Sequence, residues 1–195
     1  MTDPRERLLE AAARIYAEQG FLGATTRRIA TEAGVNEVTL FRQFGSKEAL
    51  LRASLERAGA EILSPGLPES PSDPAAEVAR WAVALWEQLA AHRSMIRTCM
   101  GEIETHPEIM PTCGSPGSAN TAAKRALCHY VKSLQESGRA RRDVDPGPAA
   151  SLLMGAIFAD AMSRDLMPEM YSRPARQTVT EYVRLFLRAV LVECA

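Results

Sequence analysis

Apolar residues recur three and four positions apart along almost the whole chain, and this periodicity constrains the fold more than any other feature of the sequence. Such spacing places apolar side chains on one face of an α-helix, whereas a half-buried strand requires strict alternation. No window of useful length alternates. We therefore expect an all-α protein of about nine helices and no strands.

The first four helices are delimited by capping residues and glycines. A short polar side chain accepts a hydrogen bond from the first turn of a helix, and glycine tolerates the left-handed conformation after the last turn. Caps are expected at Asp3, at Thr25 or Thr26, at Asn36 and at Ser46, and ends at Gly20, Gly34 and Gly45. The segment thus predicts one longer helix, two short ones and a fourth through Leu55 toward Ile62.

A segment rich in proline and serine, residues 64–74, interrupts this pattern. Proline cannot continue a helix, so we place a domain boundary here, between residues 1–63 and 64–195. The second domain is expected to hold five helices, the last two over about 148–166 and 174–192, and a loop over 107–117. Its expected buried residues include Met100, Ile103 and Leu152.

Residues 25–45 have the pattern of a helix-turn-helix, two short helices joined by the turn Gly34-Val35-Asn36. On a helical wheel Leu40 and Phe44 face the core, which leaves Val38 and Arg42 on the opposite face. A valine there can contact a thymine methyl, and arginine can donate to guanine or phosphate. The second helix can therefore read a DNA major groove, although an ordinary helical corner has the same spacing.

The basic residues are arranged locally, since 23 Lys and Arg against 24 Asp and Glu leave a net charge of only −1. Arg27, Arg28 and Lys47 lie in first turns of helices, where the helix dipole disfavours a cation by about 0.3 to 1 kcal/mol. An exposed side chain can avoid this cost by extending into water. Three such cations around one candidate reading helix are better explained by phosphates.

Several short motifs accompany the helix-turn-helix: Thr25-Thr26-Arg27-Arg28-Ile29-Ala30, Ala33-Gly34-Val35-Asn36, Thr39-Leu40-Phe41 and Phe44-Gly45-Ser46-Lys47-Glu48-Ala49-Leu50. With these motifs, residues 8–51 resemble the DNA-binding domain of TetR-family transcriptional regulators. The remaining chain is similar to the family in helix count and in the Asp143-Val144-Asp145-Pro146 opening of a late helix. The resemblance implies a homodimer with an all-helical effector-binding and dimerisation domain, which usually represses transcription until a small molecule lowers its DNA affinity.

By position, the resemblance implies phosphate contacts at Thr26 and Lys47 and base contacts at Arg27, Glu37, Val38, Thr39, Arg42 and Gln43. Phe41 stands where the family usually has tyrosine, which removes a hydroxyl that contacts phosphate. Val38 replaces a smaller residue, which bears on the operator sequence. The expected DNA-binding set is Thr25, Thr26, Arg27, Arg28, Glu37, Val38, Thr39, Phe41, Arg42, Gln43 and Lys47.

The sequence carries no zinc-protease, nucleotide-binding or serine-hydrolase motif, so we expect no enzymatic activity and no cofactor. Cys99, His106 and Cys113 are not at an established metal-ligand spacing, so we expect no metal. Four cysteines without a C-x-x-C pair do not form a disulfide scaffold. Signal-peptide and membrane-span patterns are missing, which predicts a cytoplasmic protein without a membrane segment.

Tryptophan and methionine side chains between the middle helices are suited to line an effector cavity, because thioethers adapt to irregular ligands. Stripes at helical spacing are also typical of an ordinary core. The expected effector-pocket residues are Trp81, Leu85, Trp86, Met95, Cys99, Met100, Tyr130, Met154 and Phe158. Few charges fall within these stripes, so we expect an apolar or weakly polar effector.

The last helix carries a broad apolar stripe that the penultimate helix can cover only in part. Two copies of this helix pair, packed about a twofold axis, would bury both stripes in a four-helix bundle. The expected dimer interface is Leu153, Ile157, Val179, Tyr182, Val183, Phe186, Leu187 and Val190. A twofold dimer presents two recognition helices, which match a palindromic operator.

The sequence therefore predicts a homodimeric DNA-binding transcriptional regulator, a repressor that a small apolar effector releases from its operator. Two alternatives remain open. One is a regulator that responds to cysteine oxidation, with Cys113 as the exposed candidate. The other is a helical carrier of hydrophobic molecules, in which residues 24–47 are only a structural corner and site-specific DNA binding is absent.

Overall fold

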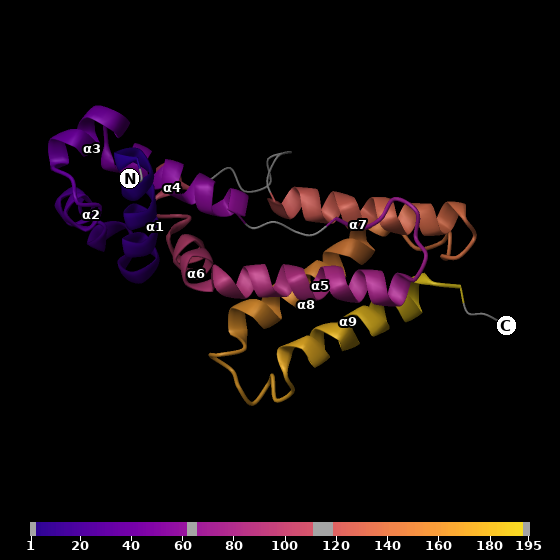
Figure 1. Ribbon diagram of the computed structural model, residues 1–195. Coiled ribbons are helices and arrows are strands. Elements are labelled where there is room, and N and C mark those ends of the chain that lie inside the picture. Colours follow the sequence, from indigo (N-terminus) through magenta and orange to yellow (C-terminus); the bar gives the residue numbers. More distant parts are fainter. Residues whose placement is uncertain (1–2, 62–65, 111–118, 193–195) are drawn as a thin grey trace. The chain divides into compact units, whose positions relative to one another are not determined.

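The computed structural model describes residues 3–61, 66–110 and 119–192, and this part of the chain contains nine α-helices and one 3-10 turn (Figure 1). The elements in chain order are α1 (Pro4–Gly23), α2 (Thr26–Glu32), α3 (Glu37–Phe44), α4 (Lys47–Glu61), α5 (Pro74–Ala91), α6 (Arg93–Glu102), η1 (Pro107–Ile109), α7 (Ala119–Glu136), α8 (Pro146–Ser163) and α9 (Ala175–Val190). The expectation of an all-helical fold with nine helices is confirmed.

The helices form two compact units. The first contains α1–α4, α6 and η1, and the second contains α5 and α7–α9. The boundary expected after residue 63 would instead assign α6 and η1 to the second domain. Ile109 of η1 is fully buried in the core of the first unit, which explains why this later segment joins the N-terminal helices. The division into two functional domains stays a prediction.

The N-terminal helices begin where the capping residues predict. Asp3, Thr25 and Asn36 each accept a hydrogen bond from a backbone N–H of the following first turn. Gly34 and Gly45 adopt φ angles of 64° and 77°, which are left-handed values that favour glycine. The turn between α2 and α3 is therefore fixed on both sides by local chemistry.

Helix α1 breaks at Gly20, where the sequence predicted its end, and continues for one more turn to Gly23. Gly20 has φ 65° and ψ −170°. A Cβ atom at this position would lie 2.4 Å from a carboxylate oxygen of Glu102. The backbone conformation therefore favours glycine, and a side chain here would also displace the Glu102 carboxylate.

Helix α1 packs against α4 and α6 and supplies much of the first core. The predicted stripe is buried: Leu8, Leu9, Ala12, Ile15 and Tyr16. Helix α6 buries less than expected, since Met100 is 55% exposed and Ile103 is 49% exposed. The expectation for these two residues is wrong, because α6 packs mainly on α1 and only its other apolar side chains, Met95 and Cys99, contribute to this core.

Helices α5, α7, α8 and α9 enclose the second core, in which Trp81, Tyr130, Ile157 and Val183 are buried. Helix α9 packs against α5 and α8. Phe186 is only 7% exposed and Leu187 only 6% exposed within one chain. The argument that the α9 stripe needs a second chain is therefore wrong, because α5, which lies far earlier in the sequence, covers it.

The outward face of α8 has an unusual composition. Leu152, which was expected to be buried, is 76% exposed, whereas the adjacent Leu153 is 2% exposed. The exposed positions of the helix before its last turn are Pro148, Ser151, Leu152, Gly155 and Ala159. These residues carry no charge and follow the spacing of one helix face, so α8 presents an uncharged strip to solvent.

Glu77, near the start of α5, is buried and hydrogen-bonded on both carboxylate oxygens. Its Oε1 accepts from the backbone N–H groups of Ser72 and Asp73, each at 3.1 Å, and from the Ser72 hydroxyl. Its Oε2 accepts from the phenol of Tyr130 on α7. These bonds, first that from the Ser72 hydroxyl, lower the pKa of Glu77 to about 2. The start of α5 is thereby joined to α7.

Asp160 on α8 is fully buried and joins three helices. Its carboxylate pairs with Arg164 at 2.6 Å and accepts from the indole N–H of Trp86 at 2.7 Å and from the Tyr182 hydroxyl at 3.2 Å. Burial and the Asp160 charge raise the pKa of Tyr182 to about 12. The Asp160 carboxylate is therefore satisfied by side chains from α5, from α9 and from the end of α8.

Candidate nucleic-acid interface

Helix α3 has one buried face and one open face. Leu40 is fully buried, whereas Val38 is 73% exposed and Phe41 is 48% exposed. Arg42 is exposed as well. The open face thus presents an apolar side chain and a cation together, the combination that contacts thymine methyl groups and guanine or phosphate in a major groove.

The first turn of α3 is fixed from two directions. The Asn36 Oδ1 accepts hydrogen bonds from the N–H of Thr39 at 2.8 Å and from its hydroxyl at 2.9 Å. Glu37 accepts from the hydroxyl of Thr26 on α2 at 2.6 Å. The Thr26 hydroxyl has a single proton, so a phosphate that accepts from Thr26 would compete with Glu37 for it.

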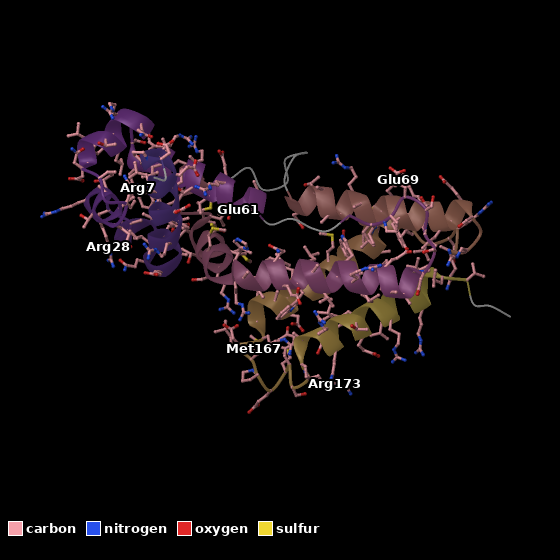
Figure 2. All side chains as sticks on the ribbon, in the orientation of Figure 1. Arg7, Arg28, Glu61, Glu69, Met167 and Arg173 are labelled. Carbon is pink, nitrogen blue, oxygen red and sulfur yellow. The ribbon has the colours of Figure 1, made fainter. Side chains whose placement is uncertain are left out.

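The cations around α3 fall into two groups. Arg27 and Arg42 are exposed, and their side chains have no hydrogen bond or ion pair among the residues that the structure describes. Arg28, exposed on α2 (Figure 2), donates to the side-chain oxygen of Gln19. Lys47 is partly buried and donates from Nζ to the backbone oxygen of Phe21 at 2.7 Å. Two of these cations are thus available to bind phosphate, and the other two already donate to groups of the protein.

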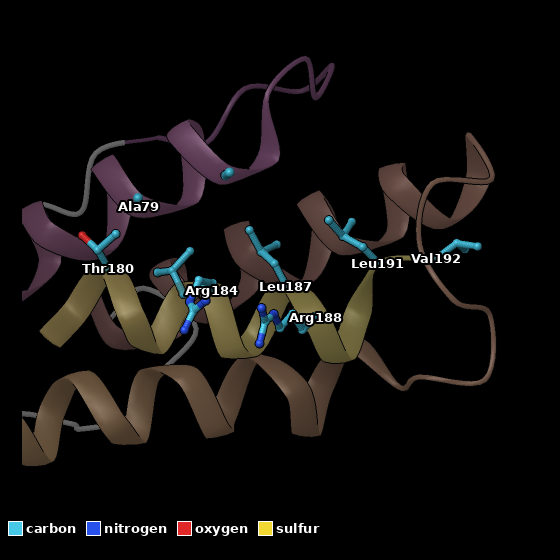
Figure 3. A pocket seen from close by; sticks show the side chains of 9 residues that line it. Ala79, Thr180, Arg184, Leu187, Arg188, Leu191 and Val192 are labelled. Atoms are coloured by element: carbon cyan, nitrogen blue, oxygen red, sulfur yellow. The ribbon is translucent and has the colours of Figure 1, made fainter. Parts of the chain in front are cut away.

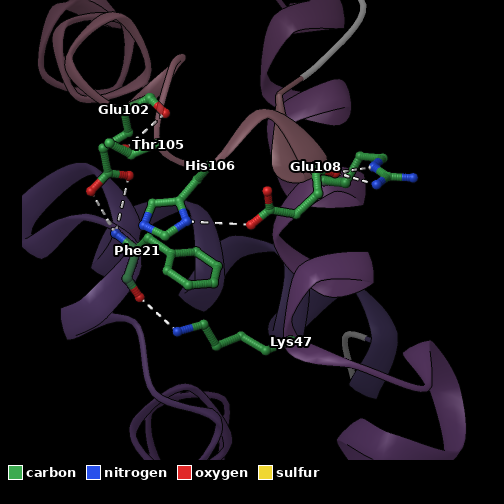
Figure 4. Close-up of polar contacts among 7 residues, drawn as sticks. Phe21, Lys47, Glu102, Thr105, His106 and Glu108 are labelled. Carbon is green, nitrogen blue, oxygen red and sulfur yellow. Dashed lines mark hydrogen bonds and ion pairs between the residues drawn. The ribbon is translucent and has the colours of Figure 1, made fainter.

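Lys47 belongs to a cluster that the sequence did not reveal (Figure 4). Its ammonium lies 3.7 Å from the ring centroid of Phe21, and that ring stacks on His106 at 3.9 Å. The carboxylate of Glu102 accepts from the N–H of Phe21 at 2.9 and 3.1 Å. Glu102 is 81 residues from Phe21 and Lys47 is 26 residues from it, so no local pattern could have indicated these contacts.

The first unit contains the complete predicted DNA-binding set, on α2, α3, the start of α4 and the caps between them. The predicted effector set is divided instead. Met95, Cys99 and Met100 belong to α6 in the first unit, while the six other residues lie on α5, α7 and α8 in the second. The expectation of one pocket from all nine is therefore not supported by the packing of α6 on α1.

The indole N–H of Trp81 is a buried donor of the second core that has no hydrogen-bond partner among the described residues. The side chain of Trp81 is 1% exposed. An unpaired buried donor costs about 1 to 3 kcal/mol. The neighbouring tryptophan on the same helix, Trp86, is satisfied by Asp160.

A groove of about 430 Å³ lies between α5 and α9 (Figure 3). Its lining is mostly apolar and includes two arginines: Ala75, Ala79, Thr180, Val183, Arg184, Leu187, Arg188, Leu191 and Val192. None of the nine expected effector residues lines it. The groove is therefore a surface separate from the expected pocket.

The described residues include no group of three or more His, Cys, Asp or Glu side chains that could hold a metal ion. Cys99 and Cys128 form no disulfide. Cys113, on which the oxidation hypothesis rests, lies outside the described residues. Within the same described part, no helix is long and apolar enough to cross a membrane.

Comparison with known proteins agrees with this geometry. Residues 8–54 match the family "Bacterial regulatory proteins, tetR family", and residues 79–189 match the "AefR-like transcriptional repressor, C-terminal domain". The uncharacterised HTH-type transcriptional regulator YvkB of Bacillus subtilis is 24% identical over 97% of this chain and 98% of its own. The HTH-type transcriptional repressor AcnR of Corynebacterium glutamicum is 38% identical over 35% of this chain and 38% of its own.

A similar fold occurs in the crystal structure of a TetR transcriptional regulator from Agrobacterium tumefaciens. That structure superposes with a TM-score of 0.78 at 20% identity, over 98% of this chain and 96% of that one.

The helix-turn-helix with its open α3 face and the helical second unit define a DNA-binding transcriptional regulator. Since the two family matches together extend from residue 8 to residue 189, the chain belongs to the TetR family of transcriptional regulators. Members of this family act by binding DNA and not as enzymes. This finding rules out the hydrophobic carrier without DNA binding.

Proposed function

We propose that the protein is a homodimeric repressor that binds a palindromic operator and leaves it when a small apolar effector binds the second unit. The observation that carries the DNA-binding part is the open face of α3, where Val38 and Arg42 project into solvent beside the cations of α2 and α4. The chain would act in the cytoplasm, where bacterial DNA lies.

The residues have distinct proposed roles. Val38 and Arg42 read base edges, because they lie on the open face of α3. Lys47 contacts a phosphate, because its ammonium has two further N–H donors after bonding to Phe21. Arg27 is a further contact whose side chain has no partner in the described structure. The remaining expected contacts are Thr25, Thr26, Arg28, Glu37, Thr39, Phe41 and Gln43.

We place the dimer interface on the outward faces of α8 and α9 instead of the stripe expected from the sequence. That stripe is buried within one chain, whereas α8 exposes only uncharged residues and α9 exposes Leu185 to 55%. Small residues such as Gly155 and Ala159 let two helices approach closely. A second copy of the chain suits this strip, since a uniformly uncharged helix face is unusual in contact with water.

The effector is proposed to be apolar with one hydrogen-bond acceptor. The second core contains two buried carboxylates, and both are satisfied by protein donors. The unpaired indole N–H of Trp81 is the remaining donor that a ligand oxygen could satisfy. In a Trp86→Phe protein, Trp81 is the single tryptophan, and its fluorescence should be quenched by 2-octanone and not by octane.

A gel-shift titration at several salt concentrations tests the DNA-binding proposal. The duplex is one enriched from a random library by the wild-type protein, and its scrambled sequence is the control. Specific binding should exceed non-specific binding by about 10³-fold or more, and both should weaken as salt rises. Equal affinity for the two duplexes would reject a sequence-specific regulator.

A further inference from the structure

The break in α1 at Gly20 separates one particular pair of backbone groups. In a continuous helix the N–H of Phe21 would bond to the backbone oxygen of Ala17. The conformation of Gly20 separates these two groups. Each then finds a partner on α6: Phe21 donates to the carboxylate of Glu102, and Ala17 accepts from the hydroxyls of Ser94 at 3.0 Å and Thr98 at 3.2 Å.

Helix α6 therefore supplies an acceptor for the N–H of Phe21 and donors for the backbone oxygen of Ala17. This arrangement fixes the backbone of Phe21, and His106, which follows α6, fixes its ring by stacking at 3.9 Å with an interplanar angle of 28°. The backbone oxygen and the ring of Phe21 in turn hold the Lys47 ammonium. A continuous series of contacts thus leads from α6 through one phenylalanine to one cation of the DNA-binding surface (Figure 4).

The segment after α6 is itself joined to α4. Arg52 donates from Nε to the backbone oxygen of Glu108 at 2.7 Å, and the Glu108 carboxylate lies 3.3 Å from the His106 Nδ1. His106 is therefore held between Phe21 and Glu108. The ring is part of a packed arrangement and not a free surface side chain.

We propose that Glu102 and His106 are positioning residues for DNA binding, which set the place of the Lys47 ammonium through Phe21. The inference rests on the proposed phosphate contact of Lys47. Loss of either partner of Phe21 would therefore displace the Lys47 ammonium from its place and weaken its contact with phosphate. One of the proposed phosphate contacts then depends on Glu102 and His106, whereas the exposed side chains of Val38 and Arg42 on α3 do not touch either residue.

The salt dependence of DNA affinity distinguishes the loss of one phosphate contact from a general loss of folded protein. Each phosphate contact contributes about −0.9 to the slope of log K against log salt concentration. Glu102→Ala should make the slope less steep by about one for each bound DNA-binding domain. Glu102→Gln should stay close to wild type, because its amide oxygen can still accept from Phe21. Glu104→Ala, which removes an exposed acid from the same segment, is the control for charge.

His106 offers an independent pair of variants. His106→Phe keeps a ring that can stack on Phe21, and His106→Ala removes it. The alanine variant should reduce the salt slope and the phenylalanine variant should preserve it. Circular dichroism melting of every variant identifies those that remain folded. If Glu102→Ala unfolds, the two variants of the partly exposed His106 still test the inference.

Combination with Lys47→Ala decides the inference. All titrations use a labelled duplex of about 30 base pairs enriched by the wild-type protein, at about 50 to 200 mM salt. We expect Lys47→Ala to reduce the slope and Glu102→Ala or His106→Ala to add nothing further in that background. Additive effects, or wild-type slopes in Glu102→Ala and His106→Ala, would overturn the positioning role alone. A wild-type slope in Lys47→Ala would overturn the phosphate contact and the inference together.

Discussion

Replacement of Leu152 by glutamate should separate the proposed dimer without unfolding the chain. Leu152 is 76% exposed on the outward face of α8, so the substitution removes little buried surface from a single chain. In the proposed dimer the same side chain is covered by the second copy. Because the interface is twofold symmetric, one substitution in the sequence changes both sides of it.

The expected size of the effect follows from the exposure of this side chain. Complete burial of a leucine contributes about 1.5 to 3 kcal/mol, and about three quarters of that surface is available to the partner. Each Leu152 then contributes about 1 to 2 kcal/mol, and the pair about 2 to 4 kcal/mol. The dissociation constant should rise by about 30-fold to several hundred-fold. Desolvation of the new carboxylates would increase this further.

Sedimentation equilibrium at micromolar concentration, with thermal unfolding of the same samples, measures both properties. Leu166→Glu is the matched control, because Leu166 is 66% exposed but lies beyond the end of α8. Phe186→Glu, at a position only 7% exposed, should unfold the chain instead. A folded Leu152→Glu protein that dimerises as tightly as Leu166→Glu would refute the placement of the interface.

Three further substitutions test other parts of the structure. Arg42→Ala should cost about 1 to 3 kcal/mol on the operator and relax preference at one base position, and equal losses on operator and scrambled duplexes would contradict its base-reading role. The pKa of Glu77 is about 2 in the folded chain and near 4.5 in the unfolded chain, so the charged carboxylate stabilises the fold fully when the pH is above 4.5. This stabilisation is lost as the pH falls toward 2. Wild type should therefore lose about 2 kcal/mol more than Glu77→Gln between pH 7 and pH 3 in urea unfolding; parallel pH profiles would contradict the assignment. Gly20→Ala should lower the free energy of unfolding by about 1 to 2 kcal/mol and less in a Glu102→Ala background, whereas equal losses in both would show that Glu102 does not crowd the site.

Local signals predicted the DNA-binding helices well, because their limits depend on neighbouring residues alone. Asn36 caps α3 through a bond to Thr39, and Gly34 and Gly45 adopt left-handed conformations that their immediate surroundings require. The helical wheel similarly separated Leu40 from Val38, since a short helix on one core has a single inner face.

Features that depend on distant packing were missed. Leu152 and Leu153 are adjacent in the part of α8 that precedes its first charged residue, so the periodicity does not distinguish which of them faces the core. The burial of Phe186 depends on α5, and the stacking of Phe21 on His106 depends on where α6 lies. Asp160 did offer a sequence signal, because it is the first charge after a stretch of uncharged residues in α8.

Selection of duplexes from a random library by the purified wild-type protein, followed by sequencing, tests the central claim most directly. If α3 reads DNA in a twofold dimer, the enriched sequences should share an inverted repeat with half-sites separated by about one helical turn or a multiple of it. The same selection with Arg42→Ala should weaken one position in each half-site. Enriched pools that remain as diverse as the starting library would contradict the claim that this chain is a sequence-specific regulator.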